Sequence, residues 1–226
     1  MNHTLFPAAH CINGKDNSHE YTQNDIKIIL GAHNLEIAHE RGKVVVGVDS
    51  ILLHQDWKIY SESFDADIAI LTLTDNVSFG RFIQPICLID PNTEVGRIAT
   101  GYSVGYGRSE KTENAETVLK SVEIPIARDN EECFYTHDAL VKLSSKRTFC
   151  GGSREGAGIC LGDSGNGLFV KHSETYYLRG IVSASLYTDL NCDVHNYGIF
   201  TNVIKFNSWI IENIDQNDRA IIFRCE

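Results

Sequence analysis

Residues 160–168 read Cys160-Leu161-Gly162-Asp163-Ser164-Gly165-Asn166-Gly167-Leu168, a serine set among glycines and an aspartate just after a cysteine. Glycine leaves the backbone free to turn sharply and to approach a bound group closely. Such a turn exposes the Ser164 hydroxyl and directs successive N–H groups at one point, as in a nucleophile beside an oxyanion hole. An ordinary glycine-rich surface turn would give the same letters, so other segments must decide between the two.

Two other residues supply the remaining parts of a nucleophilic site. His10 ends the short apolar run 5–9, and Asp67 opens the apolar run 68–71. A neutral imidazole can take the proton of a serine hydroxyl during attack, and a carboxylate behind the ring fixes its tautomer. A packed histidine and a turn aspartate are the alternatives. The order His, Asp, Ser, with Asn166 two residues after the serine, does not match the Gly-x-Ser-x-Gly elbow of α/β hydrolases.

Short apolar or alternating segments fill most of the chain, as expected for β-strands. We expect strands at residues 26–31, 44–53, 67–73, 118–126, 168–170, 176–183 and 197–203, and loops at 149–159 and 186–196. Residues 128–143 look partly helical, and the apolar spacing at 204–214 predicts an amphipathic helix near the C-terminus. With no β-α alternation, this pattern predicts an all-β barrel or sandwich.

The bulk composition is that of a globular protein. The 226 residues are 42% hydrophobic and 22% charged, enough for a sizeable core, and no apolar run reaches the length of a membrane span. A net charge of −10 argues against nucleic acid and against anionic membranes as partners. The nine histidines are dispersed, so we expect neither a metal site nor a cofactor.

The seven cysteines stand singly, with no Cys-x-x-Cys pair. This spacing favours disulfides and an oxidising compartment over zinc, although seven reduced cysteines are the alternative. The sequons at Asn2 and Asn76 are candidate glycosylation sites and fit a secreted, extracellular protein. The first residues contain no signal peptide and the cysteine count is odd. We therefore expect the chain to be incomplete at its N-terminus.

Three ordered segments carry a family resemblance: Ala8-Ala9-His10-Cys11, Asp67-Ile68-Ala69-Ile70-Leu71 and Gly162-Asp163-Ser164-Gly165. They resemble the signature segments of chymotrypsin-like (trypsin-type, S1) serine proteases. Supporting segments occur at residues 84–88, 105–107, 180–183 and 197–201, so the resemblance covers the chain from about Leu5. Residues 162–168 are similar in detail to modular or clip-type arthropod proteases.

The resemblance implies one protease domain over residues 1–226, built from two antiparallel β-barrels. The N-terminal barrel would cover about 1–100, with its first strands missing. The C-terminal barrel would cover about 101–203 and end in a helix at about 204–214.

The resemblance also implies a serine endopeptidase acting on proteins or peptides. His10 would be the general base, Asp67 its orienting carboxylate and Ser164 the nucleophile, with the N–H groups of Gly162 and Ser164 as the oxyanion hole. Ser183 would support Asp67. Protease inhibitors and an upstream regulatory domain would be further partners. The alternative is a non-catalytic homologue that acts as a binding or cofactor module.

By the same resemblance, the primary substrate pocket would be formed by Gly158, Ile159, Ser183, Ala184, Ser185 and Gly198. Gly158 takes the basal position, where a carboxylate would select arginine or lysine, so we expect an apolar P1 preference. A carboxylate from elsewhere, such as Asp189 or Asp193, would overturn this expectation.

Two further features follow from the resemblance alone. The implied disulfides are Cys133–Cys150 and Cys160–Cys192, with Cys225 a candidate partner for Cys87 and Cys11 without a partner in this chain. In the family, a new N-terminal ammonium group, usually of an Ile-Val-Gly-Gly sequence, pairs with the aspartate before the nucleophile, here Asp163. We expect that partner to be absent from this chain.

Overall fold

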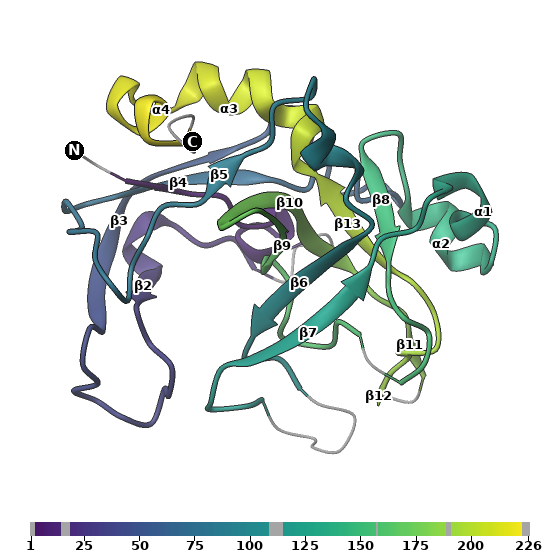
Figure 1. The fold of residues 1–226 in the computed structure, drawn as a ribbon, viewed down its shortest axis with the longest axis horizontal. Helices are drawn as coiled ribbons and strands as arrows, with labels where there is room; N and C mark the ends of the chain where they lie inside the picture. The colour runs from purple at the N-terminus through teal and green to yellow at the C-terminus, as the bar shows by residue number, and fades with distance from the viewer. Residues whose placement is uncertain (1–2, 15–18, 109–114, 157, 189–190, 223–226) are drawn as a thin grey trace.

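The computed structural model describes residues 3–14, 19–108, 115–156, 158–188 and 191–222. Its first sheet has four strands in the order β1-β4-β3-β2, and every neighbouring pair is antiparallel (Figure 1). The strands are β1 (Thr4–Leu5), β2 (Lys27–Leu30), β3 (Val44–Leu53) and β4 (Ala69–Leu73). These segments are rich in valine, isoleucine and leucine, which suit a pleated, half-buried surface.

The second sheet has seven strands, and six of them follow the order β7-β6-β9-β10-β13-β8. They are β6 (Thr100–Gly105), β7 (Lys120–Pro125), β8 (Thr148–Gly151), β9 (Gly167–His172), β10 (Thr175–Ala184) and β13 (Gly198–Asn202). The seventh, β5 (Cys87–Leu88), pairs in parallel with β10. A bridge between Ile126 and Gly151 joins the two ends of the sheet, so the sheet curls back on itself.

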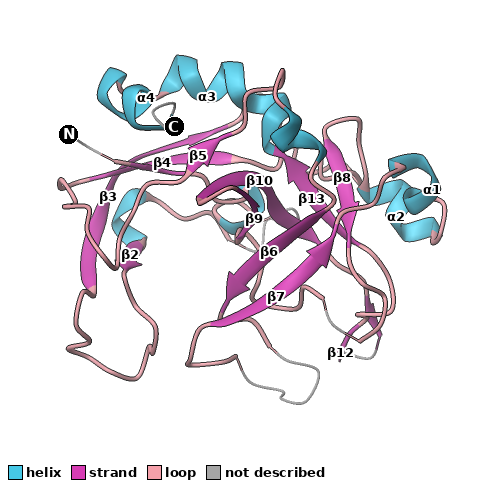
Figure 2. Cartoon of the chain, viewed as in Figure 1, coloured by secondary structure: helices cyan, strands magenta, loops and turns pink. Residues whose placement is uncertain are grey.

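The helices are short and lie at the periphery of the two sheets (Figure 2). They are α1 (Asn130–Phe134), α2 (Asp138–Leu143), α3 (Asn207–Asn213) and α4 (Gln216–Ile222). Single 3-10 turns are η1 (Ala9–Cys11), η2 (Gln23–Asp25), η3 (Glu94–Arg97) and η4 (Val203–Phe206), and β11 (Tyr187–Thr188) and β12 (Asn191–Cys192) form a small hairpin. Within the described ranges, no helix has the length and apolar character needed to cross a bilayer.

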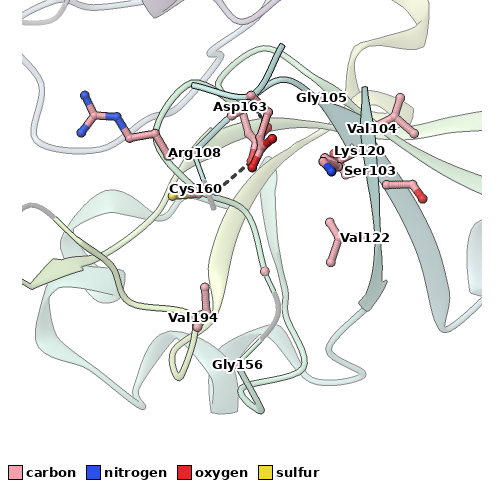
Figure 3. A pocket seen from close by; sticks show the side chains of 14 residues that line it. Ser103, Val104, Gly105, Arg108, Lys120, Val122, Gly156, Cys160, Asp163 and Val194 are labelled. Carbon is pink, nitrogen blue, oxygen red and sulfur yellow. Dashed lines mark hydrogen bonds between the residues drawn. The ribbon is translucent and has the colours of Figure 1, made fainter. Parts of the chain in front are cut away.

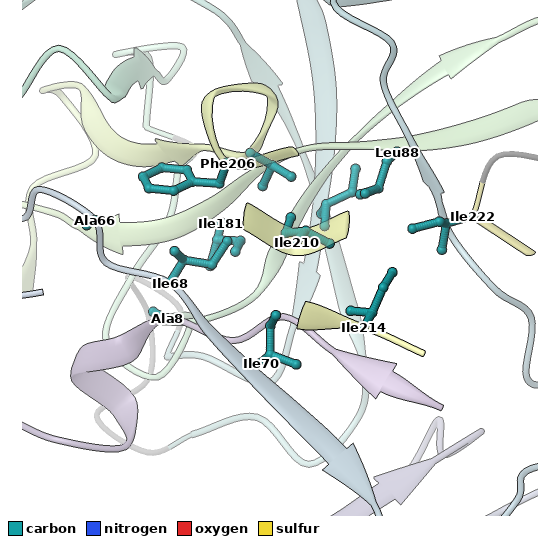
Figure 4. Packing of buried hydrophobic residues seen from close by; sticks show 12 residues of the cluster. Ala8, Ala66, Ile68, Ile70, Leu88, Ile181, Phe206, Ile210, Ile214 and Ile222 are labelled. Atoms are coloured by element: carbon teal, nitrogen blue, oxygen red, sulfur yellow. The ribbon is translucent and has the colours of Figure 1, made fainter. Parts of the chain in front are cut away.

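The largest apolar cluster joins the two sheets to the C-terminal helices (Figure 4). Ile70 of β4 and Ile68 directly before it pack against Ile181 of β10. Phe206 of η4 and Ile210 of α3 complete this part of the cluster. All five are at most 2% exposed, so each contributes about 1.5–3 kcal/mol through burial. This packing joins β4 to β10 and to the C-terminal helices.

The predicted all-β architecture of two antiparallel sheets is confirmed, and so is the helix near residue 204. The prediction of a loop over 149–159 was wrong at its start, because β8 runs from Thr148 to Gly151. All four residues of β8 are buried, so the strand lacks the alternation that a half-buried strand shows. The hairpin within 186–196 and helix α4 were also missed.

Candidate active site

His10 and Asp67 lie in two different segments that connect strands of the first sheet. His10 lies in η1, and Asp67 lies two residues before β4. The Nδ1 atom of His10 is 2.7 Å from Oδ2 of Asp67, and the backbone N–H of His10 donates to Oδ1 at 2.9 Å. The carboxylate therefore holds both the ring and the backbone of the histidine. Because a carboxylate accepts only, Nδ1 carries a proton and Nε2 is left to act as a base when the ring is neutral.

Asp67 is fully buried, and the second sheet supplies two more of its contacts. The Ser183 hydroxyl donates to Oδ2 at 2.5 Å, and the Thr201 hydroxyl donates to the Asp67 carbonyl at 2.8 Å. A buried carboxylate is costly unless hydrogen bonds stabilise its charge, and Asp67 has three such bonds. The site therefore depends on the contact between the two sheets.

The surroundings of His10 act on its pKa in opposite directions. Burial of the ring lowers the pKa, but the hydrogen bond to Asp67, helped by its negative charge and by Cys11, outweighs burial. The net effect raises the pKa of His10 above its ordinary value of 6.5. The carboxylate therefore strengthens the histidine as a base and stabilises the imidazolium that forms when it takes a proton.

The turn that carries Ser164 joins β8 to β9 and leaves the serine exposed. Gly162 has φ of +91°, a conformation that residues with a side chain seldom adopt. The carbonyl of Leu161 accepts a hydrogen bond from the Arg108 N–H at 2.8 Å. Since C=O and N–H point in opposite directions across a trans peptide, the Gly162 N–H points away from Arg108.

The N–H groups of Gly162 and Ser164 donate no hydrogen bond among those formed by the described residues. Both residues are exposed. Two backbone N–H groups, one on a serine and one two residues before it, are donors of the kind that stabilise a tetrahedral oxyanion.

The turn of Ser164 lies directly against the segment of His10. A Cβ atom at Gly165 would come within 3.2 Å of Cys11 Sγ and 3.4 Å of the Ala8 nitrogen. Across the described part of the chain, no hydrogen bond joins the Ser164 hydroxyl to His10, and Cys11 Sγ lies 3.8 Å from His10 Nε2. Catalytic hydrogen bonds are often long in ligand-free structures, so this geometry is compatible with a serine–histidine pair.

Asp163 lines a cavity of about 430 Å³ (Figure 3). Burial raises the pKa of Asp163, more than its hydrogen bonds from Cys160, Gly107 and Asn166 lower it. Gly105 and Gly107 make room for it, because a Cβ atom at either position would lie within 2.4 Å of the carboxylate. The sequence named residues 105–107 only as a supporting segment and gave neither these two glycines nor Asn166 a contact with Asp163, since nothing in local spacing brings residues 105–107 to the turn.

Two residues of the predicted substrate pocket lie against aliphatic side chains, and one of them, Gly158, also lines the cavity that contains Asp163. A Cβ atom at Gly158 would contact Val194 at 3.6 Å, and one at Gly198 would lie 2.5 Å from Ile159 Cδ1. Ile159 therefore occupies the space beside Gly198. Of the remaining predicted pocket residues, Ala184 and Ser185 are partly exposed, and Ser183 directs its hydroxyl to Asp67.

The two carboxylates that would overturn an apolar pocket are placed differently. Asp193 accepts hydrogen bonds from His195 N and Asn196 Nδ2, so it caps its own turn. Asp189 lies outside the described residues.

The structure contains the disulfides Cys133–Cys150 and Cys160–Cys192, and Cys11 has a free thiol. Cys87 is disulfide-bonded, while its candidate partner Cys225 lies outside the described residues. The same is true of the sequon residue Asn2, whereas Asn76 is exposed. No cluster of three or more potential metal ligands occurs among the residues that the structure describes.

Comparison with known proteins gives concordant matches over nearly the whole chain. The family model described as Trypsin matches residues 2–210. "Serine protease gd" of Drosophila melanogaster is 33% identical over 91% of the chain and 45% of its own length. "CLIP domain-containing serine protease HP8" of Bombyx mori is 28% identical over 94% of the chain and 59% of its own length. "Phenoloxidase-activating factor 1" of Holotrichia diomphalia is 28% identical over 94% and 60%. The chain thus spans between 45% and 60% of the length of these curated relatives.

Proposed function

Because the chain belongs to the trypsin family of serine proteases, we propose that it is an endopeptidase that cleaves peptide bonds through an acyl-enzyme on Ser164. The observation that carries this proposal is the buried Asp67 carboxylate, which fixes His10 by two hydrogen bonds beside an exposed serine. A histidine that only filled the core would not need a buried carboxylate that Ser183 and Thr201 of the second sheet hold in place.

In the proposed mechanism, His10 Nε2 takes the proton of Ser164 as Oγ attacks the scissile carbonyl. The negative charge that develops on the carbonyl oxygen accepts hydrogen bonds from the N–H groups of Gly162 and Ser164. His10 then gives its proton to the leaving amine as the C–N bond breaks. In the second half of the reaction, water attacks the acyl-enzyme with His10 again as the base. The ester bond to Ser164 then breaks, the acid product leaves, and His10 returns the proton to Ser164 Oγ. Asp67 keeps the imidazole in one tautomer throughout.

We further propose that the P1 side chain is apolar. Glycine at 158 provides no carboxylate for arginine or lysine, and Ile159 and Val194 line the same region with aliphatic groups. Since Ile159 lies across Gly198, small apolar side chains fit better than aromatic ones.

The setting that we propose is extracellular. Two disulfides suit an oxidising compartment, and the exposed Asn76 is available for glycosylation. Protein substrates, protease inhibitors and an upstream regulatory domain are the proposed partners. The relatives support the last of these, since one is named for a CLIP domain and the chain spans only part of each.

A fluorophosphonate probe tests the proposal, because it phosphonylates only a serine that a base has activated. The folded protein should label, and Ser164→Ala should abolish labelling while leaving thermal unfolding unchanged. A second candidate, a non-catalytic homologue, is favoured by one observation: the neighbour of His10 Nε2 is Cys11 Sγ rather than the Ser164 hydroxyl. Absence of Ser164-dependent labelling would favour this second candidate.

A further inference from the structure

The Asp163 carboxylate is held by three N–H donors from its own chain. Oδ1 accepts from the Gly107 N–H and from the side-chain amide of Asn166, both at 3.1 Å. Oδ2 accepts from the Cys160 N–H at 3.0 Å. Of these donors, only Asn166 is a side chain. No ion pair within the described part of the chain involves Asp163, so the amide is the sole side-chain partner there.

The backbone fixes Asn166 in place for this contact. Its N–H donates to the Asp163 carbonyl at 3.0 Å, and its own carbonyl accepts from the Val182 N–H of β10 at 2.8 Å. The Gly165 N–H donates to the Val182 carbonyl at 2.9 Å, so two backbone bonds tie the turn to β10. The short side chain of Asn166 therefore reaches Asp163 with little loss of conformational freedom.

The space around the amide is closely matched to this arrangement. A Cβ atom at Gly105 would lie 2.0 Å from Asn166 Nδ2, so the amide occupies the volume that the glycine leaves open. Gly107 leaves open the volume that the Asp163 carboxylate fills. An amide donor that is this closely packed acts as a fixed partner and does not rotate freely.

The contacts of Asp163 restrain the turn that carries the two exposed N–H groups. Asp163 stands between Gly162 and Ser164 in the chain, and its carboxylate is bound to the N–H groups of Gly107 and Cys160. The adjacent N–H groups of Gly107 and Arg108 hold the turn at two points, Asp163 Oδ1 and the Leu161 carbonyl. Loss of the Asp163 contacts would release the first of these points.

From these contacts we infer that Asn166 is a positioning residue. Its amide keeps the Asp163 carboxylate turned inward, with no cationic partner among the described residues, and thereby keeps the Gly162 and Ser164 N–H groups in place. This inference rests on the proposed function, because it concerns the oxyanion hole of that same site. With the Asn166 amide in this role, part of the activity does not require an ammonium group paired with Asp163.

The test measures fluorophosphonate labelling of Ser164 in the full chain and in three variants. Asn166→Ala removes the amide, and Asn166→Asp keeps its size but replaces the donor with a second carboxylate. Asn92→Ala is the matched control, because the exposed Asn92 amide donates to Asp90 Oδ1 at 3.0 Å in a turn of its own. Each protein is labelled alone, with the dipeptide Ile-Val, whose free ammonium can enter the cavity beside Asp163, and with N-acetyl-Ile-Val.

The unmodified chain and Asn92→Ala should label without any dipeptide. Both Asn166 variants should label about 100-fold more slowly, the lower end of the loss expected when an oxyanion-hole donor is removed. Ile-Val should restore labelling to these variants and N-acetyl-Ile-Val should not, a response that general destabilisation would not give.

Four results separate the inference from the function on which it rests. Labelling of Asn166→Ala at the unmodified rate overturns the inference. So does slow labelling that Ile-Val fails to restore, because Asn166 would then act by another route than Asp163. Labelling of the unmodified chain only in the presence of Ile-Val also overturns it, while supporting the endopeptidase function. No labelling of the unmodified chain under any condition overturns the proposed function itself.

Discussion

The Ser183 hydroxyl donates a hydrogen bond to Asp67 Oδ2 across the junction of the two sheets, at 2.5 Å. The same oxygen receives His10 Nδ1. Ser183 reaches this position because the pairing of β10 with β13 shifts register between Val182 and Ala184, an irregularity that re-aims the side chain between them. Ser183 of the second sheet thus stabilises the negative charge of Asp67, which lies beside the first sheet.

Replacing Ser183 by alanine removes a donor that stabilises the charged form of Asp67. Without this donor, the negative charge of the carboxylate acts more fully on the His10 ring, so the pKa of His10 rises further. Fluorophosphonate labelling should fall about tenfold at pH 7, the effect of one pKa unit, and recover at higher pH. Urea unfolding should show a loss of about 1–3 kcal/mol, because a buried charged acceptor loses a partner.

Ser103→Ala is the control for this experiment. Ser103 is also buried, at 3% exposed against 2% for Ser183, but its hydroxyl donates to the neutral Gly167 carbonyl. Its removal should change stability by about 1 kcal/mol and leave the pH dependence of labelling unchanged. An equal pH shift in both variants would contradict a specific role for Ser183.

The pH dependence of labelling should report the raised pKa of His10. Only the neutral ring can accept the serine proton, so the rate rises with pH through that pKa, with a midpoint above 6.5. Asp67→Asn removes the hydrogen bond and charge that raise the pKa, so the midpoint should move to lower pH. The plateau should also fall by about four orders of magnitude, since an amide does not hold the required tautomer. A midpoint that stays in place in Asp67→Asn would contradict the assignment.

The sequence was sufficient to predict the strands that alternate or carry long β-branched runs, such as the predicted segment 44–53, which is β3. It failed for β8, because Thr148–Gly151 is buried on both faces and shows no alternation. It also failed for α4, whose two buried residues, Asp218 and Ile222, give too short a pattern to indicate a helix.

The residues of the candidate site also differ in whether the sequence alone could predict their roles. His10, Asp67 and Ser164 could be named because each stands in a recognisable local segment. The roles of Asn166, Gly105 and Gly107 could not, since they arise from the approach of β6 to a turn that is about sixty residues later in the chain, and only the folded chain shows that contact.

Truncating Ile159 should change the preference for the P1 side chain. Its Cδ1 atom lies 2.5 Å from where a Cβ of Gly198 would be, so the side chain fills the space beside that glycine. Ile159→Ala should raise kcat/KM for a phenylalanine P1 substrate relative to an alanine P1 substrate by about tenfold, within the range expected for added methylene-sized space.

The buried Ile89 provides the control for Ile159. Ile89→Ala should cost a similar amount of stability, about 2–5 kcal/mol, and leave the ratio of the two substrates unchanged. An unchanged ratio in Ile159→Ala, measured with matched peptide substrates on folded protein, would place the P1 pocket elsewhere.

Gly162 and Gly156 have nearly the same backbone conformation. Comparing alanine variants at the two positions therefore separates the effect of backbone strain from the effect on the catalytic geometry. Gly162 has φ of +91° and Gly156 has φ of +90°, so alanine costs about 1–2 kcal/mol of strain at either position. A Cβ atom at Gly162 would lie 3.2 Å from the Gly107 Cα, whereas one at Gly156 would meet nothing within 4 Å. Gly162→Ala therefore pushes apart the two segments that hold the oxyanion-hole turn. Its labelling rate should fall by about 10²-fold, the loss seen when an oxyanion donor is removed, while Gly156→Ala labels normally at a similar melting temperature. Equal labelling by the two variants would show that the Gly162 N–H does not stabilise the developing oxyanion.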